Sequence, residues 1–363
     1  MTRAELQEGA ADLLIRFNRV ICQWATGVGK SGVVMQFLKK RPNITCLILV
    51  PEQANIENWK AEFNKFGIPL DGVTIACYAS YHKYSNTNWG LLVFDEAPHI
   101  DTEKRKKICN TVHGFFILAL GAVISRDEVA VLEAIYGDFV KSYISLSKAI
   151  EMGFLGKPKV NICHIKLDNK EKKVWYQGRL YTEKEAYDII DWQTAKAVDR
   201  FNKFKNKRNE QKMFRLGLER KQCLGSLKST AAKRLCKHLQ SQGKRFICFC
   251  SSIKQANQLG GANALTSQTP RRYHLLQQFN NHEINSLYVV GKLIEGQNLN
   301  GIEEGVIIQL SNKERITVQS IGRVMRSPNP VIWILVFDDT KDESLLYDVI
   351  HTILEQYISH YNL

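Results

Sequence analysis

The chain has 363 residues, of which 44% are hydrophobic and 24% are charged. This composition excludes a globally disordered chain, and the length indicates two domains, because single cores seldom grow beyond about 250 residues. The formal charge of +14 and the isoelectric point near 9.3 favour a polyanionic partner such as nucleic acid, although a basic surface without that role would have the same composition.

The cysteines and the apolar runs limit the cellular setting. Nine cysteines are scattered without a CxxC pair, which argues against a zinc site and indicates reduced thiols. The N-terminal segment is polar and amphipathic, and the longest apolar run, residues 115–124, is too short to span a membrane. We therefore expect a soluble cytoplasmic protein with no membrane partner.

From residue 19 to about residue 158, short apolar runs alternate with helical patterns. Strands are predicted at 19–24, 46–51, 73–78, 91–96 and 115–123, with helices at 31–40 and 54–66. Continuous apolar runs separated by helices are typical of a parallel sheet that is covered on both faces. The first domain, residues 1–160, is therefore predicted as a doubly wound α/β lobe.

The composition then changes, and Lys, Glu, Gln, Arg and aromatic residues dominate. We predict a basic helical connector over residues 161–225. The α/β alternation returns with strand candidates at 245–250, 286–291, 305–310 and 331–337. Residues 226–363 are therefore predicted as a second α/β lobe.

Residues 24–31, WATGVGKS, lie between the first predicted strand and the first predicted helix, where a phosphate-binding loop belongs. Gly27 and Gly29 let backbone N–H groups turn toward a phosphate, and the helix N-terminus adds its dipole. Lys30 would reach the β- and γ-phosphates, and the Ser31 hydroxyl would bind Mg²⁺. ATP and Mg²⁺ are therefore the predicted cofactors.

The loop departs from the general pattern at Trp24, where a glycine is usual. The match is to the variant A/P-T-G-x-G-K-S/T, in which Thr26 and Gly27 form the turn and Val28 is the variable position. A chance glycine-rich turn is the alternative, and the flanking strand and helix argue against it.

Asp95 and Glu96 stand at the end of the fourth predicted strand. Ligands of open α/β sheets bind at the carboxyl ends of the strands, so this pair is expected to face the phosphate loop. Asp95 would hold Mg²⁺ through a water molecule, and Glu96 would orient and deprotonate the attacking water. Two acids at a strand end also occur as a helix cap or a solvated turn. The presence of Lys30 favours the catalytic interpretation.

These residues resemble those of superfamily 2 helicases and translocases, and the likeness extends over most of the chain. Within this resemblance, Gln7 looks like the glutamine that reads adenine. The segment that starts at Pro51 and Glu52 resembles motif Ia, and Ala79–Ser80 resembles the next turn that touches the nucleic-acid backbone. Residues 132–160 are similar to the run that leads out of the first lobe in restriction-enzyme motors and phage helicases.

Two segments depart from the family. DEAPHI resembles the DEAH-type box, but Pro98 stands where the family has His or Asp, and His99 follows it. The family generally has S/T-A-T in motif III, whereas this chain has Gly121, Ala122 and Val123. The loss of those hydroxyls puts strand separation in more doubt than ATP hydrolysis, so a weak unwinder or a pure translocase is also consistent with the sequence.

Three segments of the second lobe carry the resemblance further. Ser251 lies in a segment similar to motif IV, and Glu295, Gly296 and Asn298 occupy the usual places of motif V, where the resemblance implies nucleotide contacts. The third segment, residues 319–326, matches motif VI, QxxGRxxR.

In motif VI the resemblance implies catalytic roles for Gln319, Arg323 and Arg326. Negative charge spreads over the γ-phosphoryl oxygens in the transition state, so guanidinium groups delivered from the second lobe would stabilise it when the lobes close. Two arginines on a basic helix are otherwise a solvated face.

The connector combines basic residues with aromatic residues, notably Trp175, Tyr176, Tyr181, Trp192 and the range 201–204. This combination is a candidate track for a single strand, but burial in a helical core is the commoner fate of such aromatics.

The sequence predicts a nucleic-acid-stimulated ATPase, a helicase or translocase, with RecA-like lobes and an ATP site between them. DNA is favoured over RNA because the resemblance is to restriction and phage motors. The alternatives are a regulatory module that binds nucleotide and nucleic acid without productive turnover, and an RNA-directed remodeller. Little of the chain is left for a sequence-reading domain, so a protein partner is a candidate source of specificity.

Overall fold

The computed structural model describes residues 1–97, 102–290, 299, 301–310, 322, 324–347 and 355–362. The chain divides into two compact units. Met1–Gly156 form the first unit, and Lys157–Ile294 with Leu299–Leu363 form the second. Each unit is built around one parallel sheet.

The first unit contains a six-stranded parallel sheet in which every strand predicted for this lobe is present. The central strands are apolar on both faces, and all five residues of the second strand are buried, as expected for a sheet covered by helices on both sides. In sheet order the strands are β3 (Val73–Cys77), β2 (Cys46–Val50), β4 (Asn88–Phe94), β5 (His113–Gly121), β1 (Arg19–Trp24) and β6 (Val140–Ile144).

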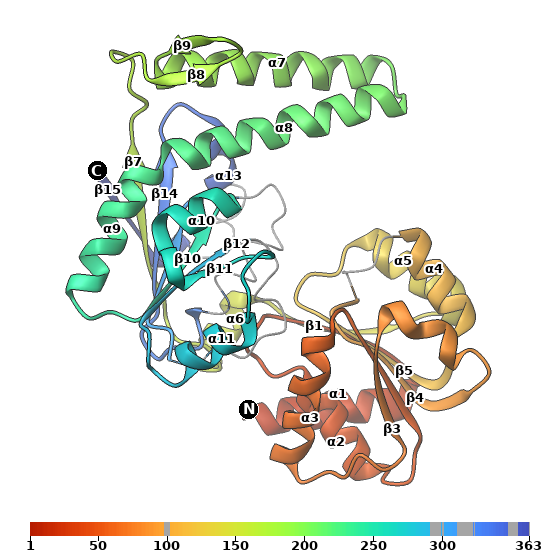
Figure 1. Ribbon diagram of the computed structural model, residues 1–363. Helices are drawn as coiled ribbons and strands as arrows, with labels where there is room; N and C mark the ends of the chain where they lie inside the picture. Colours follow the sequence, from red (N-terminus) through yellow and green to blue (C-terminus); the bar gives the residue numbers. More distant parts are fainter. Residues whose placement is uncertain are drawn as a thin grey trace. The chain divides into compact units, whose positions relative to one another are not determined.

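Helices cover both faces of this sheet (Figure 1). One face carries α1 (Arg3–Phe17), α2 (Ser31–Lys40) and α3 (Gln53–Phe66), and the other carries α4 (Thr102–Thr111) and α5 (Arg126–Tyr136). Capping boxes start α1 at Thr2 and α5 at Ser125. The short elements η1 (Tyr78–Tyr84) and α6 (Leu146–Glu151) complete the unit. The predicted doubly wound lobe is confirmed.

The second unit contains a seven-stranded parallel sheet. In sheet order the strands are β11 (Ala264–Leu265), β12 (Ser286–Val290), β10 (Phe246–Cys250), β13 (Glu304–Ile307), β14 (Val331–Phe337), β7 (Lys159–Ile165) and β15 (Ile358–Asn362). The helices of this unit outside the predicted connector are α9 (Ser229–Ser241), α10 (Ile253–Gly260), α11 (Arg272–Asn280) and α13 (Lys341–Leu346), with η3 (Gly261–Asn263) and η6 (Glu355–Tyr357). This second parallel lobe is also confirmed.

The start of the predicted connector differs from the structure. Residues 161–165 belong to β7, which pairs in register with β14 and β15. This strand lies between β14 and β15 in the second sheet, although these partners follow it by about 170 and about 200 residues. The local sequence could not show this pairing, because the strands that flank β7 in space are far from it in the chain.

The rest of the predicted connector forms a small hairpin and two long helices. The hairpin strands are β8 (Val174–Tyr176) and β9 (Arg179–Tyr181). The helices α7 (Glu183–Lys203) and α8 (Lys207–Leu227) lie side by side (Figure 1). Tyr187, Leu224 and Phe337 pack together at their base, so the helix pair is attached to the core of the second sheet.

A buried ion pair lies where α8 meets α9. The ammonium group of Lys228 is 2.6 Å from the carboxylate of Asp342, and both side chains are fully buried. Lys228 also donates to the carbonyl oxygen of Ile308, directly after β13, and to that of Leu335, within β14. Burial lowers the pKa of Lys228, and Asp342 opposes that shift. This pair ties the helix junction to two strands.

Candidate nucleotide site and nucleic-acid interface

The carboxyl edge of the first sheet gathers the predicted site residues of the first lobe. The phosphate loop follows β1, Pro51 and Glu52 follow β2, and Asp95 and Glu96 follow β4. The predicted turn Ala79–Ser80 lies in η1, directly after β3. Because all of these strands are parallel, their ends meet at one edge, where ligands of open α/β sheets bind.

The phosphate loop has the backbone that an anion site needs. Gly27 and Gly29 have φ of 93° and 94°, a region that favours glycine. Helix α2 begins at Ser31, and no side chain caps its first N–H groups. The buried hydroxyl of Thr26 has no hydrogen-bond partner among the described residues. Lys30 donates to the carbonyl oxygen of Trp24 at 3.1 Å. These groups fit a bound phosphate.

Gln7 lies buried against the loop. Its amide nitrogen donates to the carbonyl oxygen of Gly29 at 2.8 Å. A Cβ atom at Gly32 would lie 2.3 Å from the Gln7 carboxamide, and one at Gly29 would lie 2.7 Å from it. The glycine at position 32 is the sequence signal for this contact.

The Asp95 carboxyl group is half-buried at the end of β4. Burial and the neighbouring Glu96 raise the pKa of Asp95 to about 6, while a hydrogen bond from Trp59 and the charge of Lys30 act in the opposite direction. Glu96 has φ of 46°, a backbone conformation in which residues other than glycine are strained.

Helix α3 supplies two contacts that we did not predict. The indole nitrogen of Trp59 donates to a carboxylate oxygen of Asp95 at 2.8 Å. One turn further along the helix, Glu62 accepts a hydrogen bond from the Ser31 hydroxyl at 3.1 Å. The spacing of Trp59 and Glu62 places both on one face of α3. This spacing is the only sequence signal for these contacts.

The same two contacts bear on the predicted metal site. Because Trp59 and Glu62 are neighbours on one helix face, their partners Asp95 and Ser31 are both held by the same face of α3. A carboxylate and a hydroxyl are the oxygen ligands that Mg²⁺ takes in phosphate-transferring sites. The residues present therefore fit Mg²⁺.

In the second unit, Ser251 follows β10 at the carboxyl edge of its sheet. Its hydroxyl donates to the side-chain oxygen of Gln255 at 2.9 Å, and Gly225 of α8 lies so close that a Cβ atom there would be 2.3 Å from the Ser251 hydroxyl. The hydroxyl that we predicted to contact nucleic acid is therefore held within the second unit.

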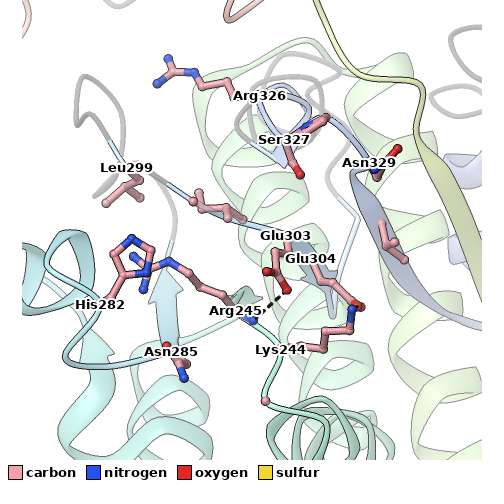
Figure 2. A pocket seen from close by; sticks show the side chains of 15 residues that line it. Lys244, Arg245, His282, Asn285, Leu299, Glu303, Glu304, Arg326, Ser327 and Asn329 are labelled. Atoms are coloured by element: carbon pink, nitrogen blue, oxygen red, sulfur yellow. Dashed lines mark hydrogen bonds and ion pairs between the residues drawn. The ribbon is translucent and has the colours of Figure 1, made fainter.

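Arg326 lines a pocket of about 740 Å³ in the second unit (Figure 2). Lys244, Arg245, Glu303 and Glu304 also line it, and they lie at or just before the first residues of β10 and β13. The pocket is therefore at the amino edge of the second sheet. Figure 2 shows the guanidinium group of Arg326 pointing away from the two glutamates.

The remaining predicted site residues lie outside the described part of the chain. They are Pro98 and His99 of the DEAH-type box, Glu295, Gly296 and Asn298 of motif V, and Gln319 and Arg323 of motif VI.

Comparison with known proteins shows which solved structures have a similar fold. No protein-family model matches the chain, and no curated protein matches its sequence. The crystal structure of the Hef helicase domain from Pyrococcus furiosus aligns with a TM-score of 0.59 and 13% identity, over 93% of this chain and 97% of that one. The structure of Mss116p bound to ssRNA and AMP-PNP aligns with a TM-score of 0.61 and 13% identity, over 95% and 71%. The chain shares with these two helicase structures a fold of two parallel α/β lobes.

This shared fold confirms the predicted pair of RecA-like lobes. The likeness to phage helicases and restriction-enzyme motors stays a prediction. Among the described residues, no helix combines the length and the apolar composition that crossing a bilayer requires.

Proposed function

We propose that this protein is a nucleic-acid-stimulated ATPase that moves along nucleic acid, with DNA preferred over RNA. The observation that supports the proposal most is that the phosphate loop with Lys30 and the Asp95 carboxyl group both follow parallel strands at one edge of the same sheet. A lysine that binds phosphate and a carboxylate that holds Mg²⁺ must share one site for ATP hydrolysis. The helicase fold and the charge of +14 agree with a nucleic-acid partner.

Each residue of the first lobe has a defined part in this proposal. The N–H groups of the loop and Lys30 bind the β- and γ-phosphates, which hold the substrate in place. Ser31 and Asp95 hold Mg²⁺, which when bound neutralises charge on the phosphate oxygens. For Ser31 to do so, its hydroxyl must leave Glu62. Glu96 orients a water molecule and accepts its proton.

The second lobe completes the site in this proposal. Arg323 and Arg326 direct positive charge toward the γ-phosphoryl group when the lobes close, and Gln319 helps to place them. Glu295 and Gly296 contact the nucleotide. The backbone of a nucleic acid contacts Pro51 and Glu52, the turn Ala79–Ser80, and the region of Ser251.

The helices α7 and α8 offer a further nucleic-acid surface. Trp192 is 57% exposed, and the ammonium group of Lys196 lies 3.7 Å from the centre of its ring. Phe204, between the two helices, is 61% exposed beside Lys203 and Lys205. The commoner fate of such aromatics, burial in a core, does not apply to these two. Exposed rings beside cations suit stacking on bases and pairing with phosphates.

A binding module without turnover is the second candidate. The segment at the end of β5 favours it, because Gly121, Ala122 and Val123 lack the hydroxyls that help couple hydrolysis to strand movement in the family. Such a protein would bind ATP and nucleic acid as a regulatory unit.

Measurement of phosphate release separates the two candidates. The wild-type protein is assayed with Mg·ATP alone and with equal lengths of single-stranded DNA, duplex DNA, forked DNA and RNA. We expect release that DNA stimulates more than RNA does, and none in Lys30→Ala. Glu96→Gln should bind a fluorescent ATP analogue as the wild type does but release no phosphate. Wild-type release no higher than that of Lys30→Ala would leave only the binding module.

A further inference from the structure

Asp95 receives hydrogen bonds from two segments that lie far apart in the chain. Trp59 of α3 donates its indole N–H to the carboxylate at 2.8 Å. Tyr78, the first residue of η1, donates its hydroxyl to the main-chain carbonyl oxygen of Asp95, also at 2.8 Å. Both rings are 4% exposed. The carboxylate and the backbone of Asp95 are therefore each held by a rigid aromatic side chain.

Each of these segments also carries a predicted nucleic-acid contact. Helix α3 begins at Gln53, directly after Pro51 and Glu52. Tyr78 directly precedes Ala79 and Ser80. A movement of either turn on binding nucleic acid would therefore move a residue that holds Asp95.

Packing restricts independent movement of the linking side chains. The ring of Tyr78 stacks on that of Phe94, the residue before Asp95, at 6.5 Å between centroids. The thiol of Cys77 donates to the side-chain oxygen of Gln53 at 3.7 Å, which joins the starts of the two segments. Close-packed interiors transmit displacement because they deform little.

The usual coupling element of the fold has changed in this chain. At the end of β5, Gly121, Ala122 and Val123 carry no side-chain hydroxyl. If nucleic acid stimulates hydrolysis here, the signal must reach the site through other contacts. Helix α3 contacts both predicted Mg²⁺ ligands, because Glu62 also holds Ser31.

We propose that Trp59 and Tyr78 are positioning residues that couple nucleic-acid binding to the Asp95 carboxylate. This inference rests on the proposed function. When nucleic acid binds, it moves the two turns, and through Trp59 and Tyr78 this movement sets the angle of the Asp95 carboxylate. The angle of the carboxylate then sets the affinity for Mg·nucleotide. Because coupling between two binding sites is reciprocal, Mg·nucleotide must change nucleic-acid affinity by the same factor.

The test uses Trp59→Phe and Tyr78→Phe in the full chain, since both variants remove the donor and keep a ring. Fluorescence anisotropy gives the Kd of a labelled single-stranded DNA with and without Mg²⁺ and a non-hydrolysable ATP analogue. The ratio of these constants is the coupling factor, which is typically about 5 to 150 for coupled sites. We expect it to fall below about 3 in both variants. The Kd without nucleotide should change less than about twofold.

Two variants of the same lobe serve as matched controls. Tyr136→Phe keeps the ring that packs on Phe94 and removes a buried hydroxyl that donates to the carbonyl oxygens of Cys109 and Val112, not to Asp95. Trp89→Phe shortens a buried indole whose N–H has no partner among the described residues. Both should keep the wild-type coupling factor. Phosphate release by all four variants shows whether stimulation by DNA falls with the coupling factor.

The outcomes separate the inference from the proposed function. Wild-type coupling in both Trp59→Phe and Tyr78→Phe would overturn the inference, and so would an equal loss in the controls. If Trp59→Phe does not fold, Tyr78→Phe decides alone, because it removes a single oxygen atom. A wild-type protein that releases no phosphate would instead refute the proposed function.

Discussion

At the scale of single residues, Gly32 shows how closely the phosphate loop is packed. A glycine inside a helix usually costs stability, and its replacement by alanine stabilises an exposed helix by up to about 1 kcal/mol. Here the added Cβ atom would lie 2.3 Å from the carboxamide of Gln7. At this position glycine should therefore give a more stable helix than alanine, the reverse of the usual order.

Gly32→Ala should lower the free energy of unfolding by about 1–3 kcal/mol, because the buried Gln7 carboxamide must move away from the new methyl group and lose its hydrogen bond to Gly29. Gln7→Ala in the same chain should remove part of that loss, which urea denaturation of the single and double variants would detect. Gly9→Ala in α1, where no atom lies within 4 Å of the added group, is the control and should be neutral or stabilising. Additive effects of positions 7 and 32 would contradict the packing argument.

Asp95 carries a pH dependence of stability. Its pKa in the folded protein, about 6, lies above the ordinary value of 3.8. Between these values the folded protein holds a proton that the unfolded chain releases, so the contribution of Asp95 to stability falls as pH rises from about 4 to about 6.

Asp95→Asn does not titrate and should remove this contribution. We consider the free energy of unfolding of the variant minus that of the wild type, measured without ligands. This difference should be about 2 kcal/mol larger at pH 7.5 than at pH 4.5. Chemical denaturation at the two pH values measures this difference. A gap between the two proteins that is the same at both pH values would show that the Asp95 carboxyl is not perturbed by burial.

At the scale of elements, the junction of α8 and α9 depends on one buried charge pair. Lys228 and Asp342 are both fully buried, and Asp342 also accepts from the side chain of Gln309 at 2.7 Å and from the backbone N–H of Phe337 at 3.2 Å. Removal of one partner leaves the other charge uncompensated, whereas removal of both does not.

Lys228→Met should destabilise the second unit by about 3–5 kcal/mol, and Lys228→Met with Asp342→Leu should be less destabilising than the single change. Hydrogen exchange of the strands β13 and β14, with denaturant melts, would locate the effect. Lys203→Met breaks an exposed pair with Asp199 and is the control, with a change below about 1 kcal/mol. If Lys228→Met is as stable as this control, the buried pair does not anchor the junction.

At the scale of the whole molecule, the residues of the proposed reaction come from both units. The phosphate loop and the two acids belong to the first unit, and Arg326 belongs to the second. Each unit has its own sheet and core, so loss of the arginine should leave the first unit folded and able to bind nucleotide.

Arg326→Ala should lower kcat for ATP by at least about 100-fold, because it removes transition-state charge stabilisation. The Kd of a fluorescent nucleotide, and the circular dichroism spectrum, should stay close to those of the wild type. Arg272→Ala, at an exposed position of α11, is the matched control and should keep full activity. Undiminished hydrolysis in Arg326→Ala would remove this residue from the mechanism.

The sequence by itself determined the strands of both lobes that read as continuous apolar runs, and the place of the phosphate loop between β1 and α2. It also placed Asp95 at a strand end. These features are local, because a run of apolar residues or a glycine turn depends on neighbours within about ten positions.

Only the tertiary structure decided which distant groups meet. It joined β7 to β14, placed Gln7 under the phosphate loop, and brought Trp59 and Tyr78 to Asp95. It also left Trp192 exposed on a helix whose pattern is equally typical of a core. These contacts join residues 17 to about 170 positions apart, and they follow from the path of the chain and the packing of whole elements, which no local pattern specifies.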